Sequence, residues 1–156
     1  MSNATYMKKA LDLASYGMHH NHGGPFGAVV VVNQKIVGKG YNQVTSKNDP
    51  TAHAEIVAIR SACKKLKTFC LDTAALFTSC EPCPMCLAAI YWARIPTVFY
   101  AYTQHDAKKI GFDDTWIYEE VALPVDQRKI VMKQLLRDEA LEPFKEWAEK
   151  QDKISY

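Results

Sequence analysis

Two short stretches of the chain contain residue types that bind a transition metal. His53 and Glu55 lie two residues apart in "PTAHAEIVAIR", and Cys83 and Cys86 lie three apart in "SCEPCPMC". Two cysteine thiolates and a histidine suit a tetrahedral zinc ion, and three protein ligands leave the fourth position open, as in catalytic zinc sites. We therefore predict one zinc ion per chain, bound by His53, Cys83 and Cys86. Glu55 is the predicted catalytic acid–base residue beside the open position.

Both stretches read as the beginnings of helices. The first helix is predicted from about Thr51 to Lys65, and the second covers residues 84–94, with proline at its first position and Cys83 as N-cap. A helix N-terminus has a positive dipole and free N–H groups, which favour thiolates. His53 and Glu55 do not share a helix face, but in a first turn both side chains can reach a site in front of the helix. We expect the two N-termini to meet at the metal.

A closed structural zinc site is the alternative interpretation of these residues. Its ligands would be His53, Cys80, Cys83 and Cys86. This arrangement leaves Glu55 without a role, and it requires Cys80 to turn from the end of a strand toward the same metal.

The remaining sequence predicts alternating strands and helices around these two stretches. The expected further elements are a helix over residues 6–18, hairpin strands over 27–32 and 35–42, strands over 74–79 and 97–102, and a last helix over 140–150. Residues 128–135, "RKIVMKQL", fit a fifth strand or a helix. Strand–helix–strand order implies some parallel pairing. We predict a single domain over residues 1–156, in which residues 121–156 are the less certain segment.

Composition excludes several classes of protein. The chain has 156 residues and a net charge of +2, so it gives no polycation signal for nucleic acid. It has no apolar run long enough to span a membrane, and its N-terminus lacks the apolar core of a signal peptide. Five cysteines, several of them clustered, fit metal ligands in a reducing compartment. We expect a cytoplasmic protein with neither a nucleic-acid nor a membrane partner.

The metal motif belongs to a wider resemblance. The His-x-Glu and Pro-Cys-x-x-Cys elements, in this order, resemble those of the zinc-dependent cytidine and nucleobase deaminases. The stretches "GGPFGAVVV", "NDPTAHAEIVAIR", "FTSCEPCPMCLAAIYWAR", "VFYA" and "GFDDTWIY" look like the bacterial guanine deaminases of this superfamily. The resemblance extends from about residue 5 to residue 120 and thins beyond it.

This resemblance implies a fold, a reaction and an assembly. The fold is a three-layer α/β/α cytidine-deaminase-like arrangement around a five-stranded mixed sheet. The reaction is hydrolytic removal of an exocyclic amine, here from guanine, with Glu55 moving the protons. By position, Asn42 and the backbone from Phe26 to Ala28 hold the purine base, and Ala54 directs a backbone N–H at the reacting centre. The assembly is a homodimer whose C-terminal segments are exchanged.

The pair of aspartates in "GFDDTW" bears on the choice of base. Guanine presents N1–H and an amino group side by side, and an ionised carboxylate accepts both hydrogen bonds. Adenine and cytosine each present an acceptor beside the amine, which the same carboxylate repels. Asp113 or Asp114 would provide this selectivity, and the resemblance favours Asp114. The alternative is that one of them only caps a helix beginning at Thr115.

Three aromatic residues complete the predicted substrate site. Phe26 and Trp92 are candidates to pack on the base, although such residues more often belong to the core. Tyr156 is the last residue, and we predict that it closes over the site of its own subunit or of its partner; the alternative is a frayed tail.

Three alternative functions stay open at this point. The chain could instead be a tRNA adenosine deaminase, a cytidine deaminase or a structural zinc module. The tRNA enzyme requires a basic surface, whereas residues 138–152 contain six acidic and two basic residues.

Overall fold

The computed structural model describes residues 2–156, which form two compact units. The first unit extends to Thr115, and the second comprises Trp116–Tyr156. All of the predicted metal ligands belong to the first unit.

The first unit contains a mixed sheet of four strands. These are β1 (Gly27–Val32), β2 (Lys35–Tyr41), β3 (Ala75–Cys80) and β4 (Thr97–Tyr102), in the order β2-β1-β3-β4. Strand β1 is antiparallel to both β2 and β3, whereas β3 and β4 are parallel. The hairpin turns at Asn33 and Gln34, whose φ angles are 48° and 60°, as a two-residue hairpin turn requires. The predicted hairpin and mixed sheet are therefore confirmed.

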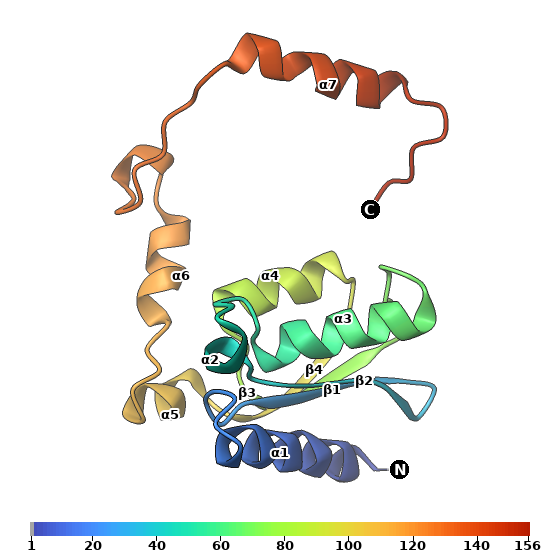
Figure 1. The fold of residues 1–156 in the computed structure, drawn as a ribbon, viewed down its shortest axis with the longest axis vertical. Coiled ribbons are helices and arrows are strands. Elements are labelled where there is room, and N and C mark those ends of the chain that lie inside the picture. Colours follow the sequence, from blue (N-terminus) through green and yellow to red (C-terminus); the bar gives the residue numbers. More distant parts are fainter. Residues whose placement is uncertain (1) are drawn as a thin grey trace. The chain divides into compact units, whose positions relative to one another are not determined.

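Helices cover both faces of this sheet (Figure 1). Helix α1 (Asn3–His19) lies on one face, and α3 (Ala54–Leu66) and α4 (Pro84–Trp92) lie on the other. Strand β1 is buried on both sides because its residues alternate between two apolar clusters. Ala28 and Val30 pack in the cluster that includes α3, while Val29 and Val31 pack with Tyr6 of α1. The predicted three-layer arrangement is confirmed.

The predicted fifth strand is wrong. The sheet has four strands, and residues 128–135 form neither a strand nor a helix. Their apolar side chains are exposed, and Val131 is 77% accessible. A strand needs a neighbour to pair with its backbone N–H and C=O groups. Within the described residues this segment has none, and β4 remains an edge of the sheet.

The other described elements are short, apart from the last helix. They are α2 (Val44–Lys47), α5 (Gln104–Lys109), α6 (Thr115–Ala122), the 3₁₀ turn η1 (Val125–Gln127) and α7 (Arg137–Glu149). Helix α7 agrees with the predicted last helix. Among the described residues, no helix combines the length and the apolar character needed to cross a membrane.

Close contact between α3 and β2 fixes the start of α3. A Cβ atom on Gly40 would lie 2.1 Å from the carbonyl oxygen of Ala54, so only glycine permits this approach. Helix α3 begins at Ala54 with His53 as N-cap, not at Thr51 as the sequence predicts. The difference arises because Asp49 accepts hydrogen bonds from the N–H and hydroxyl of Thr51, which makes a local turn instead.

Candidate functional site: a metal centre in an apolar cavity

Two helix N-caps bring the predicted metal ligands together. His53 is the N-cap of α3, and Cys83 is the N-cap of α4 with Pro84 at the first helical position. Cys86 lies in the first turn of α4 and is fully buried. The ligand atoms of His53, Cys83 and Cys86 all lie within 4.8 Å of one another. The predicted meeting of two helix N-termini is therefore what the structure contains.

The distances in this group fit zinc. Nδ1 of His53 is 3.5 Å from Sγ of Cys83 and 3.5 Å from Sγ of Cys86. A tetrahedral zinc ion, with bonds of about 2.3 Å to sulfur and about 2.0 Å to nitrogen, places such atoms about 3.5 Å apart. Among the described residues, the side chains placed closely enough to hold a metal ion together are those of His53, Cys83 and Cys86. Cys80 does not belong to this group. The geometry supports the three-ligand interpretation over the closed four-ligand one.

Electrostatics distinguish Cys83 from Cys80. The pKa of Cys83 falls to about 4, chiefly because the Cys86 side chain donates a hydrogen bond to its sulfur, with a further contribution from His53. The Cys83 sulfur is thus a thiolate at neutral pH, the form that binds metal. Burial raises the pKa of the Cys80 thiol to about 12, and its Sγ donates to the carbonyl oxygen of Thr103 at 3.8 Å. Cys80 is a neutral thiol in the cavity wall.

Glu55 is a buried carboxyl group directly beside the metal ligands. It is 5% exposed, and its Oε2 lies 3.5 Å from Sγ of Cys86. Burial is the largest of the effects that raise its pKa above the ordinary value of a glutamate. A carboxyl group with a raised pKa can both accept and return a proton near neutral pH, as an acid–base catalyst must.

A cavity of about 270 Å³ opens in front of the metal ligands. Its lining combines apolar side chains with polar and ionisable ones, as expected of a site that binds and orients a small polar molecule. The lining residues are Phe26, Asn42, Val44, Pro50, His53, Glu55, Cys80, Glu81, Cys83, Gln104, Ala107, Phe112, Asp113 and Asp114. Phe26 and Phe112 form one wall with their rings in edge contact, 4.8 Å between centroids.

The two neighbouring aspartates have different surroundings. Asp113 accepts hydrogen bonds from the N–H and hydroxyl of Thr115 and pairs with Lys108 at 2.9 Å. Asp113 is thus the residue that caps α6. Asp114 differs, because its Oδ1 is buried and has no hydrogen-bond partner among the described residues. Burial is also the main cause that raises the pKa of Asp114. An unpaired buried oxygen in a cavity wall is suited to accept hydrogen bonds from a ligand.

Asn42 has its amide oriented by the backbone around it. Its Oδ1 accepts a hydrogen bond from the backbone N–H of Val44 at 3.1 Å, and the backbone N–H of Asn42 donates to the carbonyl oxygen of Phe26 at 2.9 Å. A Cβ on Gly23 would lie 2.0 Å from this Oδ1, so the loop closes on Asn42 only because residue 23 is glycine. The hydrogen bond from Val44 fixes the orientation of the side-chain amide in the cavity wall.

Four other predicted substrate residues lie outside the cavity lining. Ala28 is buried within β1, and Ala54 is the first residue of α3, where backbone N–H groups lack intrahelical acceptors. Trp92 ends α4 and is 66% exposed, so the structure does not place it against a ligand in this cavity. Tyr156 belongs to the second unit, and its role as a lid stays a prediction.

Sequence reasoning missed the polar residues Glu81 and Gln104 and the wall residue Phe112. Glu81 lies inside the cysteine motif, two residues before Cys83, and this position was the signal for its closeness to the site. Phe112 had a similar signal, because it directly precedes the two aspartates of "GFDDTW", whereas Gln104 had none and reaches the cavity from the start of α5.

Comparison with known proteins agrees with this geometry. Residues 1–102 match the family model described as the cytidine and deoxycytidylate deaminase zinc-binding region. The chain belongs to this family. Deaminases of this family share the metal-binding region that α3, α4 and their ligands form here.

Individual relatives cover most or all of the length of this deaminase. It is 50% identical to guanine deaminase of Bacillus subtilis (strain 168), over 100% of both chains. An X-ray structure of the Bacillus subtilis guanine deaminase matches with a TM-score of 0.96, covering 100% of this chain and 99% of that one. A tRNA-specific adenosine deaminase of Buchnera aphidicola is 36% identical, over 86% of this chain and 85% of its own.

Proposed function

We propose that this deaminase catalyses the zinc-dependent hydrolytic deamination of guanine to xanthine and ammonia. The observation that carries the proposal is the unpaired, buried Oδ1 of Asp114 in the wall of the metal cavity. Guanine offers N1–H and the 2-amino group side by side, two donors that one carboxylate can accept. The full-length likeness to a guanine deaminase at 50% identity supports the same substrate.

Asn42 complements this recognition. We propose that its amide nitrogen donates to the base, since the N–H of Val44 orients the amide through its oxygen. Guanine presents ring nitrogen and carbonyl acceptors on the edges that Asp114 does not contact, so one donor and one carboxylate suffice to orient the base. Phe26 and Phe112 supply the apolar wall along which a flat ring can pack.

Glu55 moves the protons in this reaction. A zinc ion held by His53, Cys83 and Cys86 would supply a water molecule activated for attack on C2 of the base. Glu55 takes up the proton of that water and delivers it to the ring nitrogen beside C2, which makes the carbon more electrophilic. Glu55 then takes up the remaining proton of the attacking water, which is now a hydroxyl group on C2, and transfers it to the departing amine as the C–N bond breaks. The two protons of water thus end on the ring nitrogen and in ammonia. Its burial among apolar residues and its raised pKa suit both transfers.

The second candidate substrate is adenosine in tRNA, because a tRNA-specific adenosine deaminase is also a relative. Adenine presents an acceptor beside its amine, and the Asp114 carboxylate repels that arrangement. Release of ammonia from guanine, guanosine, adenine, cytosine, cytidine and tRNA, measured side by side, tests the proposal. Guanine should be the preferred substrate, and preference for tRNA or cytidine would contradict it.

Replacing Asp114 with asparagine should weaken turnover of guanine selectively. Asparagine retains one acceptor oxygen but places an amino group against a donor of the base. We expect kcat/KM for guanine to fall by about 10²-fold, since a site built around hydrogen bonds loses them and keeps an unpaired group. The matched control is Asp113→Asn, which removes the charge that caps α6 and pairs with Lys108, and it should cost a few-fold at most. Equal losses in both variants would contradict the assignment.

The pH dependence gives the same assignment a second readout. Because burial raises the pKa of Asp114, its carboxylate takes up a proton at a higher pH than an ordinary aspartate. Above that raised pKa, the wild type has the ionised carboxylate and binds guanine more tightly than Asp114→Asn. As the pH falls through the pKa of Asp114, the wild type loses this ionised acceptor. The ratio of KM values for guanine, variant over wild type, should therefore shrink toward acid. A ratio independent of pH would contradict the role of an ionised Asp114.

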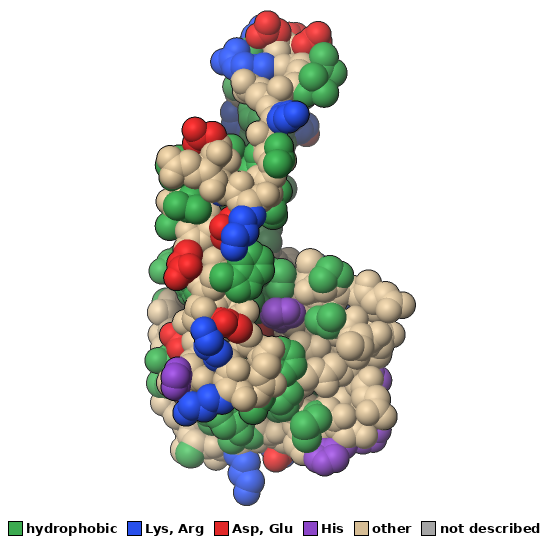
Figure 2. Space-filling view, turned by 90° about the vertical axis from the view of Figure 1, so that its left-hand side faces the viewer, with side chains coloured by type: hydrophobic (Ala, Val, Ile, Leu, Met, Phe, Trp, Pro, Cys, Tyr) green, Lys and Arg blue, Asp and Glu red, His purple; other side chains and the backbone are tan. Residues whose placement is uncertain are grey.

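The second unit supports assembly as a homodimer. Several of its apolar side chains are largely exposed: Ile130, Val131, Leu135, Leu136, Phe144 and Ile154. Figure 2 shows hydrophobic side chains at the surface of this unit among the charged ones. Exposed apolar surface of this kind commonly marks a protein interface, and we infer that a second copy of the chain covers it by exchange of residues 121–156.

The thiol ligands need a reducing compartment, which supports the expected cytoplasmic location.

Removal of the last two residues tests the predicted lid. We propose that the side chain of Tyr156, which is 71% exposed, closes over a flat base by stacking and one hydrogen bond. A chain ending at Ile154 should keep its zinc while kcat falls and KM rises, because an open site admits water. Steady-state kinetics on guanine and metal analysis are the measurements. Wild-type kinetics in the shortened chain would show that Tyr156 is not a lid on either subunit.

A further inference from the structure

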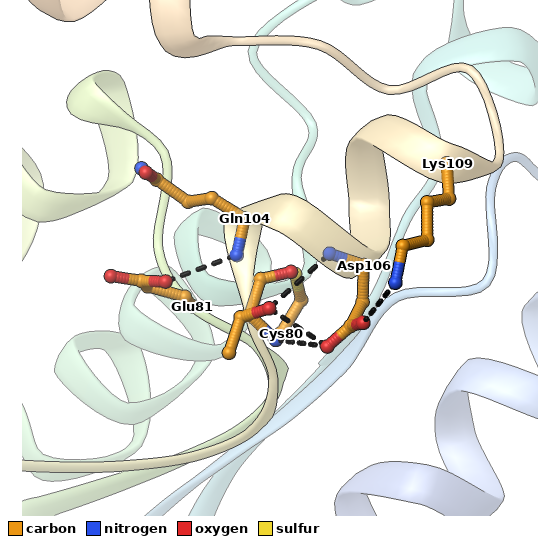
Figure 3. A network of polar contacts seen from close by, with 6 residues as sticks. Cys80, Glu81, Gln104, Asp106 and Lys109 are labelled. Atoms are coloured by element: carbon orange, nitrogen blue, oxygen red, sulfur yellow. Dashed lines mark hydrogen bonds and ion pairs between the residues drawn. The ribbon is translucent and has the colours of Figure 1, made fainter.

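Glu81 makes a hydrogen-bonded link between two segments that lie far apart in the sequence. Its backbone N–H donates to the carbonyl oxygen of Tyr102 at 2.8 Å, at the end of the parallel pair β3 and β4. Its side-chain Oε2 accepts a hydrogen bond from the backbone N–H of Gln104 at 3.0 Å, as Figure 3 shows. The residue therefore holds the β4–α5 junction at two points.

The two linked segments carry different parts of the site. Glu81 is followed by the metal ligand Cys83 in the loop between β3 and α4. Gln104 is the first residue of α5, and the chain leaving α5 provides Phe112 and Asp114 to the cavity wall. Within the cavity lining, the metal ligand and the predicted base-binding carboxylate thus belong to separate loops.

The beginning of α5 is a rigid unit on which such a link can act. Thr103 and Asp106 form a capping box: the Thr103 hydroxyl accepts from the N–H of Asp106, and the Asp106 carboxylate accepts from the N–H of Thr103. Lys109 pairs with Asp106 at 3.6 Å (Figure 3). The capping box satisfies two of the N–H groups at this helix start, and Glu81 satisfies that of Gln104 from outside the helix. The position of the Glu81 carboxylate therefore affects the position of the first residues of α5 through the bond to Gln104.

We propose that Glu81 is a positioning residue that holds the cavity wall containing Asp114 at the correct distance and orientation relative to the metal centre. This inference rests on guanine as the substrate and on Asp114 as its acceptor. Glu81 lines the cavity but is outside the metal-ligand group, and we assign its effect on the base to the link between its Oε2 and Gln104. The feature that matters is an acceptor oxygen at the end of a side chain of this length, rather than the negative charge.

Three substitutions separate reach from charge. Glu81→Gln keeps the length and an acceptor oxygen and should have a KM for guanine within about three-fold of the wild type. Glu81→Ala removes the carboxylate that contacts Gln104. Glu81→Asp keeps the negative charge, but its shorter side chain also loses this contact. Both should retain one zinc per chain and raise KM about ten-fold, with a smaller change in kcat. Loss of zinc from Glu81→Asp, or wild-type KM in Glu81→Ala, would overturn the proposal.

Asp106→Ala is the control for general loosening of α5. Asp106 bonds to Thr103 and Lys109 of the same helix start (Figure 3), so its loss weakens the cap and leaves the bond between Glu81 and Gln104 in place. It should lower the melting temperature by a few degrees and leave KM within about two-fold, as expected for the loss of one cap. If Asp106→Ala raised KM as much as Glu81→Ala, the effect would belong to the stability of α5, and the link would have no special role.

A double-mutant cycle identifies the group on which Glu81 acts. Glu81→Ala in an Asp114→Asn background should raise KM by less than about two-fold, because the carboxylate that it positions is already lost. A full ten-fold effect in that background would overturn positioning of Asp114. Failure of the proposed function looks different: the wild type itself would not turn over guanine, and Asp114→Asn would leave its binding unchanged.

Discussion

Replacing Glu55 with alanine is expected to leave a folded protein that binds one zinc ion and has lost nearly all deamination activity. The ligands are His53, Cys83 and Cys86, so removal of Glu55 leaves the metal centre intact. What is lost is the group that moves protons between water, ring nitrogen and departing amine. A positioned acid–base residue contributes a factor of about 10² to 10⁴, and kcat on guanine should fall by that amount. Metal analysis and ammonia release measure the two properties separately.

Glu55→Gln is the matched control for this experiment. Glutamine fills the same volume in the buried site, so it removes the possibility that a cavity left by alanine disturbs the metal ligands. Because an amide cannot accept and return protons near neutral pH, Glu55→Gln should be as inactive as Glu55→Ala. Substantial turnover in either variant would end the assignment of Glu55 as the proton-transfer residue.

The second large effect is expected at the cysteines. Cys83→Ala removes the sulfur whose pKa is about 4, and with it one of three metal ligands. Zinc and activity should both be lost. Cys80→Ala is the comparison, because Cys80 is three residues away, lies in the same cavity wall and has a neutral thiol that donates to Thr103.

Metal content of the purified variants distinguishes the two interpretations of the motif. Zinc should remain in Cys80→Ala and be absent from Cys83→Ala. If zinc were released by Cys80→Ala and retained by Cys83→Ala, the ligand set would be wrong. Release from both would favour the closed four-ligand site, in which the metal stabilises structure and has no open position for water.

The metal group could be predicted from the sequence because its determinants are local. Pro84 and Cys83 are neighbours that define a helix start, and Cys86 follows within the first turn. His53 is likewise the N-cap of another helix, and Glu55 is the second residue of its first turn. The two helix N-termini meet because of the order in which strands and helices follow one another. The alternation of apolar segments in the sequence already indicates this order.

Other parts of the structure depend on contacts that have no local signal. Residues 128–135 have the composition of a strand, but strand formation needs a pairing partner, and the four-stranded sheet does not provide one. Likewise, Glu81 and Gln104 become neighbours only when β3 and β4 pair. The difference between Asp113 and Asp114 was also invisible, since it arises from hydrogen bonds of Asp113 with Thr115.

The placement of all three metal ligands on α3 and α4 has a consequence for how the protein matures. Both helices are held against the sheet by the apolar cluster around Ala58, Leu76 and Ile90, independently of any metal contact. Small zinc modules, in contrast, stay unfolded until the ion arrives. We therefore expect the chain to fold first and acquire zinc afterwards, so that a cell short of zinc would accumulate a folded, inactive pool that recovers when the metal returns.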